Sequence, residues 1–138
     1  MILLDTNVVS AMMRLASEPL VEAWLNNQDT SSLWTSTVTV YEIRYGIHIM
    51  PGGKRKSELE RDFAEVVNEA LERRVLPLEM DAAIKAGAFR AKRKLAGAEI
   101  NIPDAMIAGI AVSHGYSIAT RNTKDFQGLG LALIDPWA

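Results

Sequence analysis

The sequence predicts an α/β fold built on a mostly parallel β-sheet. Short segments rich in apolar and β-branched residues alternate with longer amphipathic segments, which is the pattern of strands connected by helices. The chain has 138 residues, of which 49% are hydrophobic, a size and composition suited to one globular core. No repeat, linker or low-complexity stretch divides it, so we expect residues 1–138 to form a single domain.

The first half of the chain is predicted to contain two strands. Met1–Leu4 is an apolar run that ends at Asp5-Thr6-Asn7, as expected of a buried strand followed by a helix cap. Residues 33–38 are rich in Thr, Val and Trp, which favour a second strand. The helix after it ends at Pro51-Gly52-Gly53, which is typical of a helix terminus. The spacing of apolar residues predicts helices over residues 8–15, 18–26 and 41–50.

The second half is predicted to alternate in the same way. Pro103 introduces a helix that Gly115 closes, and turns at Gly128 and Gly130 precede the last strand. The predicted helices of this half cover residues 54–72, 81–95 and 104–114. The predicted strands cover residues 75–78, 116–120 and 131–134.

Composition excludes several kinds of site. The chain has no cysteine, which excludes disulfide scaffolds, zinc–thiolate sites and cysteine nucleophiles. No apolar run approaches the roughly 18 residues of a membrane span, and the N-terminal residues do not resemble a secretory signal. We therefore expect a cytoplasmic protein without membrane contacts. The formal net charge of −2 is unlike the basic balance of most nucleic-acid binders, so RNA binding would need local basic patches or metal ions.

Polar residues gather where the predicted strands end. Asp5 ends the first strand, and Glu42 lies in the first turn of the helix after the second strand. Asp104 opens the helix before the fourth strand, and Asn122 and Asp125 follow that strand. Because ligands of parallel α/β sheets bind at the carboxyl ends of strands, we expect these residues to form one site.

Each of these residues also has a purely structural explanation. Asp5 or Thr6 can cap a helix, and Thr39–Glu42 matches a capping box in which Glu42 reaches back to the backbone of Thr39. Asp104 can interact with a helix N-terminus, and Asp125 can be a turn residue. The functional interpretation therefore depends on the set and not on any single acid.

The set has a chemical logic. Carboxylates that converge in one pocket repel each other, and at least one takes up a proton unless a cation intervenes. Mg²⁺ and Mn²⁺ prefer oxygen ligands, whereas a chain with only two histidines and no cysteine is poorly suited to zinc. An oxygen-ligand metal site is suited to hydrolysis of phosphate esters, because it polarises the phosphoryl group and lowers the pKa of bound water.

Four segments, in this order and at this spacing, resemble the PIN domain, and within it the VapC and FitB-like toxins of type II toxin–antitoxin systems. The segments are Leu3–Asn7, Tyr41–Ile43, Ile102–Ala105 and Ala119–Phe126, so the resemblance covers essentially the whole chain. It implies a three-layer α/β/α fold with a parallel sheet of four to five strands. It also implies a metal-dependent endoribonuclease that leaves 5′-phosphate and 3′-hydroxyl ends.

The resemblance assigns roles to individual residues. Asp5, Glu42 and Asp104 match the three central acids and are expected to bind Mg²⁺ or Mn²⁺. The family often has a fourth acid where this chain has Asn122, with Asp125 three residues later, and either residue can complete the catalytic set.

Three further residues are expected beside the acids. Asn7 and Thr120 match polar positions that support them, and Arg121 is a candidate for contact with RNA because it neighbours the predicted metal site. The basic triplets Lys54–Lys56 and Lys92–Lys94 are further candidates, although Lys54–Lys56 is better explained as a solvated helix face. Trp137 is interpreted as a core or interface residue.

The resemblance also implies partners. They are an RNA substrate, a cognate antitoxin that inhibits the enzyme, a second copy of the chain, and operator DNA bound together with the antitoxin. Apolar residues of the early helices are candidates for a dimer or antitoxin groove, and equally for an ordinary core: Met12, Met13, Leu20, Trp24 and Ile47. Two other functions remain open, a phosphatase-like hydrolase with Asp5 as nucleophile and a non-catalytic module that binds antitoxin or DNA.

Overall fold

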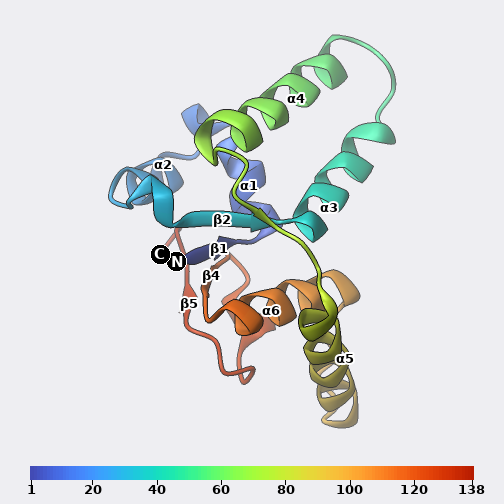
Figure 1. The fold of residues 1–138 in the computed structure, drawn as a ribbon. Helices are drawn as coiled ribbons and strands as arrows, with labels where there is room; N and C mark the ends of the chain where they lie inside the picture. Colours follow the sequence, from blue (N-terminus) through green and yellow to red (C-terminus); the bar gives the residue numbers. More distant parts are fainter.

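The computed structural model describes residues 1–138 and has a five-stranded sheet at its centre, with helices on both faces (Figure 1). All neighbouring strands are parallel, in the order β3-β2-β1-β4-β5. The strands are short and comprise β1 (Ile2–Leu4), β2 (Leu33–Ser36), β3 (Val75–Leu76), β4 (Ser117–Ala119) and β5 (Leu133–Ile134). The predicted α/β class with a parallel sheet is confirmed.

Six α-helices and four shorter helical turns connect the strands. The α-helices are α1 (Thr6–Met12), α2 (Pro19–Asn26), α3 (Thr37–His48), α4 (Lys54–Glu65), α5 (Met80–Leu95) and α6 (Ile102–His114). The turns are the 3₁₀ segments η1 (Leu15–Ser17), η2 (Thr30–Ser32) and η4 (Thr123–Phe126), and the π-helical turn η3 (Val66–Ala70), which continues α4. No helix is long and apolar enough to cross a membrane.

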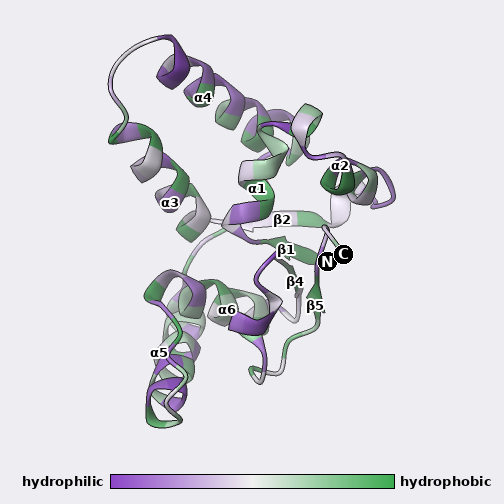
Figure 2. Cartoon of the chain, turned by 180° about the vertical axis from the view of Figure 1, so that it is seen from behind, coloured by the Kyte–Doolittle hydropathy of each residue, from purple (hydrophilic) through white to green (hydrophobic).

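The two faces of the sheet carry separate cores. Leu4 packs with Val8 of α1 and Phe63 of α4 on one face, and Leu3 packs with Ile107 of α6 on the other. This division follows from the alternation of side chains along a strand, because consecutive residues point to opposite faces. In Figure 2, β1 and β5 are hydrophobic, whereas the peripheral α4 is hydrophilic along much of its length.

The second strand ends earlier than the sequence predicts. Residues 33–38 were expected to be extended, but β2 stops at Ser36 and α3 begins at Thr37. The reason is a helix cap, since the backbone N–H of Thr39 donates to Ser36 Oγ at 3.2 Å. The β-branched residues Thr37 and Val38 favoured a strand in the prediction, and the cap outweighs that preference.

Helix α6 also starts earlier than predicted. Asn101 is its N-cap, with Oδ1 accepting a hydrogen bond from the backbone N–H of Asp104 at 2.8 Å, and Pro103 lies in the first turn. Asp104 is therefore held inside the first turn. The predicted stop at Gly115 is confirmed, because this glycine adopts the left-handed conformation with φ of 70°.

The contact between α5 and α6 predicts a strong effect of one glycine. A methyl group at Gly109 would overlap the backbone carbonyl oxygen of Ala82 and lie 3.1 Å from the backbone nitrogen of Ala86. We expect Gly109→Ala to lower the free energy of unfolding by about 1–3 kcal/mol, measured by urea denaturation. Gly46→Ala is the control, because this helical glycine has open space around it and the change should stabilise the protein by about 0.5–1 kcal/mol. Equal effects of the two changes would contradict the close helix contact.

Candidate active site

The carboxyl ends of the central strands meet at one edge of the sheet, where the predicted site residues lie. Asp5 follows β1 and is tied to β4 by the hydrogen bond from its backbone N–H to Ala119 O, at 2.9 Å. Thr120 follows β4 directly, and Glu42 comes from the second turn of α3, which follows β2. Parallel pairing of β1 with both β2 and β4 therefore brings distant parts of the chain to this edge.

Asp5 is a helix cap and a buried acid at the same time. Its side chain is only 4% exposed, Oδ1 accepts the backbone N–H of Thr6 at 2.8 Å, and Oδ2 accepts the hydroxyl of Thr120 at 2.7 Å. Burial raises the pKa of Asp5, these two hydrogen bonds lower it, and the charges of Glu42 and Asp125 raise it again. The net result is a raised pKa. Asp5 therefore differs from an exposed helix cap, whose carboxylate keeps its charge easily.

Glu42 is held by hydroxyl groups and does not close a capping box. Thr6 Oγ1 donates to Glu42 Oε1 at 2.6 Å, and the hydroxyls of Thr6 and Thr39 are 3.1 Å apart. Because Ser36 caps α3 and accepts the N–H of Thr39, the capping box suggested by the sequence is wrong. Glu42 therefore lies one turn further into the helix than predicted, and its carboxylate faces α1.

Asp104 carries the clearest sign that the acids share one space. Burial is the largest cause that raises the pKa of Asp104. The negative charges of Asp5, Glu42 and Asp125 raise it further, to about 7. The hydrogen bond from Asn101 lowers it only in part. The structure thus brings together the acids that the sequence places 37, 62 and 21 residues apart along the chain.

None of the four acids forms an ion pair with a basic side chain within 4.0 Å. The ion pairs within 4.0 Å lie elsewhere: Arg14–Glu18, Lys54–Glu58, Arg55–Glu58 and Arg74–Glu72. A half-buried cluster of four acids without a cation is electrostatically unfavourable, and only proton uptake or a bound cation relieves it. Acids with strongly shifted pKa values in one place are typical of functional sites.

Asp125 and Asn122 occupy different positions relative to the acids. The charge of Asp125 raises the pKa of both Asp5 and Asp104, and Asp125 lines a cavity of about 350 Å³ together with Asp104 and Arg90. Asn122 is exposed, and its contribution is a backbone N–H that donates to Thr120 Oγ1 at 3.1 Å. The fourth negative charge at this edge is therefore that of Asp125.

Thr120 connects the acids to their supporting residues. Its fully buried hydroxyl donates to Asp5 and accepts the side-chain amide of Asn7 at 3.4 Å. Asn7 Oδ1 in turn accepts the backbone N–H of Arg121 at 3.3 Å. Asn7, Thr120 and the backbone of Arg121 therefore lie in one chain of hydrogen bonds next to Asp5.

The donor set suits a hard divalent cation. The four acids all offer carboxylate oxygens, and a cation would relieve their mutual repulsion. No three acid or histidine side chains are close enough to enclose an ion as they stand. Mg²⁺ usually binds through one or two carboxylates and retains several water molecules, so a complete protein cage is not required.

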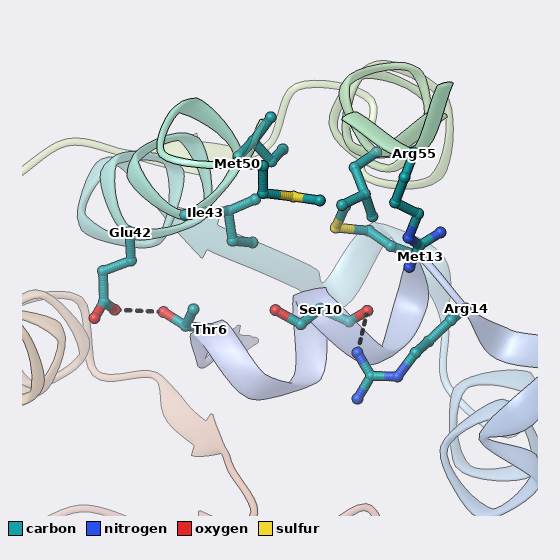
Figure 3. A pocket seen from close by; sticks show the side chains of 11 residues that line it. Thr6, Ser10, Met13, Arg14, Glu42, Ile43, Met50 and Arg55 are labelled. Atoms are coloured by element: carbon teal, nitrogen blue, oxygen red, sulfur yellow. Dashed lines mark hydrogen bonds between the residues drawn. The ribbon is translucent and has the colours of Figure 1, made fainter. Parts of the chain in front are cut away.

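A cleft leads to the acids from the side of the early helices. It has a volume of about 380 Å³ and lies between α1, α3 and α4. Figure 3 shows Thr6 and Glu42 at one end of this cleft, with Met13, Ile43 and Met50 along it and Arg14 and Arg55 at its far side. The cleft thus combines apolar residues with polar and basic ones, and Glu42 is the acid at the end that reaches the site.

Comparison with known proteins agrees with this architecture. The family model described as PIN domain matches residues 2–130. The VapC ribonuclease Y4jK of Sinorhizobium fredii is 39% identical over 137 residues, covering 99% of this chain and 98% of that protein. The toxin FitB of Neisseria gonorrhoeae is 34% identical over 137 residues, covering 99% of both chains. The solved structure of FitAB bound to an IR36 DNA fragment has a TM-score of 0.88 at 33% identity, covering 100% of this chain and 96% of that chain.

Proposed function

The chain belongs to the PIN domain family, and we propose that it is a metal-dependent endoribonuclease that acts as the toxin of a toxin–antitoxin pair. The observation that carries this proposal is the group of four acids without a cation at the carboxyl edge of the sheet. The relatives named as ribonuclease and toxin support it, since their similarity extends over nearly the whole chain. We further propose that residues 1–138 act as a single domain.

Asp5, Glu42 and Asp104 would hold Mg²⁺ or Mn²⁺, with Asp125 rather than Asn122 as the fourth acid. The ion would polarise the phosphodiester, lower the pKa of a bound water and stabilise the leaving oxygen. The protein orients the acids, because hydroxyls of Thr120 and Thr6 fix one oxygen each of Asp5 and Glu42 and leave the remaining lone pairs free.

The cleft between α1, α3 and α4 is the site that we propose for an antitoxin segment. Met13, Ile43 and Met50 offer apolar contacts, and a basic side chain at the end of the cleft would meet the acids and replace the metal. Of the groove candidates from the sequence, Met13 and Ile47 line this cleft, whereas Trp24 packs against the core. By analogy with the DNA-bound FitAB structure, the complex with antitoxin would bind operator DNA.

A second copy of the chain is the expected partner of another surface. Tyr41 and Ile102 are exposed at 65% and 49% and line an apolar cavity that also includes Met106. Exposed apolar patches of this kind often mark protein interfaces. We therefore place the proposed homodimer contact on this side of the molecule.

The phosphatase-like alternative is less well supported. An aspartate nucleophile of this kind usually has a second acid two residues later, and this chain has Asn7 at that position. A non-catalytic module would not need four acids that destabilise the fold. Both alternatives therefore fit the site less well than the nuclease.

One assay tests the proposal directly. Purified protein incubated with single-stranded RNA is expected to cut internal bonds with Mn²⁺ or Mg²⁺ and to be inactive in EDTA, with activity restored by excess metal. Mapping of the ends should give 5′-phosphate and 3′-hydroxyl groups. Cleavage that persists unchanged in EDTA would contradict the proposal, and a trapped aspartyl-phosphate would favour the phosphatase.

A further inference from the structure

Arg121 and Trp137 form a contact that the proposed chemistry does not explain. The guanidinium of Arg121 lies over the Trp137 ring, 4.8 Å from its centre. The backbone of Arg121 is fixed as well, through its N–H to Asn7 beside the acids. Arg121 is therefore attached at the rim of the site, with its charge held to one side of the acids by an aromatic ring.

The position of Trp137 is fixed in turn by two hydrogen bonds. Its indole N–H donates to Glu18 Oε2 at 2.9 Å, and its backbone N–H donates to Asp135 Oδ1, also at 2.9 Å. Asp135 follows β5, which pairs with β4 in parallel register. Adjacent strands are about 4.8 Å apart, so Trp137 follows a strand about 10 Å from β1 along the sheet edge that bears Asp5.

Arg121 forms no ion pair within the protein. Glu18 is the nearby acid, but its other oxygen accepts Arg14 at 3.1 Å, and that pair accounts for its charge. The hydrogen bond from Trp137 lowers the pKa of Glu18, and the charges of Arg14 and Arg121 lower it further. Arg121 itself is in no ion pair within 4.0 Å. Arg14 and Arg121 carry two positive charges beside the single negative charge of Glu18, so one positive charge is not balanced.

Stacking on Trp137 leaves the N–H donors at the edge of the Arg121 guanidinium free. A guanidinium held by its face over an aromatic ring keeps its N–H donors at the edge, where they match two oxygens of a phosphate. No hydrogen bond from the Arg121 side chain to another residue forms in the structure, whereas Arg14 uses its side chain on Ser10 and Glu18. Arg121 is thus an exposed guanidinium, stacked on Trp137 and without a hydrogen-bond partner in the protein, beside an acidic centre.

We propose that Arg121 binds a backbone phosphate of the RNA that flanks the scissile bond on the β5 side, and that Trp137 is the residue that positions it. The proposal rests on the nuclease function proposed above. Its physical reason is that a chain of net charge −2, whose site is itself acidic, repels a polyanion unless a cation is fixed nearby. A phosphate to one side of the acids would be held without competing for the metal.

The test is RNA binding in EDTA, which does not depend on cleavage. A fluorescent single-stranded oligoribonucleotide is titrated with the full chain at several salt concentrations. Arg121→Gln and Trp137→Leu should each weaken binding roughly 3- to 10-fold and reduce the salt slope by roughly 0.7, the value for one lost phosphate contact. Trp137→Phe keeps an aromatic face and should lose less than Trp137→Leu. Arg61→Gln removes the same charge from an exposed residue on α4 and should change neither quantity.

Each outcome decides a part of the proposal. Equal binding by Arg121→Gln and Arg61→Gln would overturn the proposal. In this comparison Trp137 and its hydrogen bonds are unchanged. Weaker binding by Arg121→Gln with no effect of Trp137→Leu would overturn the positioning role. If RNA binding were unchanged and the variant instead lost its antitoxin, the site would be one for an acidic protein segment. A failure of the nuclease proposal would appear separately, as absent cleavage by the unmodified chain with Mn²⁺.

Discussion

Replacement of Asp104 by Asn is expected to abolish RNA cleavage, with a rate loss of at least about 10³-fold. Asn keeps the shape of the side chain and the backbone N–H that Asn101 accepts, so the start of α6 should be preserved. What disappears is one of the negative charges proposed to hold the metal. Initial rates with excess Mn²⁺ measure the effect, and Asp81→Asn, which removes an acid from the first turn of α5, is the matched control and should cleave normally.

The same variant should make the metal-free protein more stable at alkaline pH. The pKa of Asp104 is about 7 in the folded chain, whereas the ordinary value, which applies to the unfolded chain, is 3.8. Between pH 3.8 and about pH 7 the folded state therefore retains a proton that the unfolded state has lost. Stability therefore falls as pH rises from 3.8 to about 7, and the full loss is present above pH 7. Asp104→Asn should recover about 1 kcal/mol at pH 8, after allowance for solvent screening of this partly exposed carboxyl and for its lost interaction with the helix N-terminus.

Thermal melting distinguishes these two effects. In EDTA at pH 8 the variant should melt higher than the original chain by roughly 3–5 °C, and the difference should vanish below pH 4. Addition of Mn²⁺ should raise the melting temperature of the original chain and leave the variant nearly unchanged. A variant that cleaves RNA normally, or that is stabilised by Mn²⁺ as strongly as the original chain, would show that Asp104 is not a ligand.

The sequence predicts the fold well because its pattern is set by local forces. Alternation of apolar and amphipathic segments identifies every strand of the sheet, and terminators such as Gly115 mark the helix ends. The errors lie at boundaries where one side chain decides the outcome. Ser36 ends β2 by capping α3, and Thr37 and Val38, which prefer strands by themselves, enter the helix.

The sequence indicates the acids of the candidate site and places Asn7 and Thr120 beside them, but it does not indicate every partner of the acids. Asp5, Glu42 and Asp104 stand out because carboxylates at the ends of strands are chemically unusual as a set. The hydroxyl of Thr6 that binds Glu42 is 36 residues away in sequence, and the indole of Trp137 that binds Glu18 is 119 residues away. Such contacts depend on the exact packing of the layers, and no local pattern records them. Trp137 packs against the core, as interpreted from the sequence, but its contacts with Glu18 and Arg121 were not anticipated.

Thr120→Val is expected to lower metal affinity and cleavage by about 10- to 100-fold, although Thr120 is not itself a proposed ligand. Valine fills the same buried space but removes the hydroxyl that donates to Asp5 Oδ2 and accepts from Asn7 and Asn122. The hydrogen bond to Asp5 lowers the pKa of that acid, so its loss raises the pKa further and favours the protonated form that cannot bind a cation. Affinity is measured by Mn²⁺ titration at several pH values, and the acid limb of binding should move to higher pH.

Thr35→Val separates this effect from a general loss of stability. Thr35 is equally buried, on the neighbouring strand β2, and its hydroxyl donates to the backbone carbonyl of Leu4 at 3.2 Å. Both valine variants should lose about 1–2 kcal/mol of unfolding free energy, because a buried partner is left unsatisfied. Only Thr120→Val should lose metal affinity, and Thr120→Ser, which restores the hydroxyl, should regain most of it. If Thr35→Val reduced Mn²⁺ affinity as much as Thr120→Val, the hydroxyl of Thr120 would act through packing alone, and Asp5 would not depend on it for its charge.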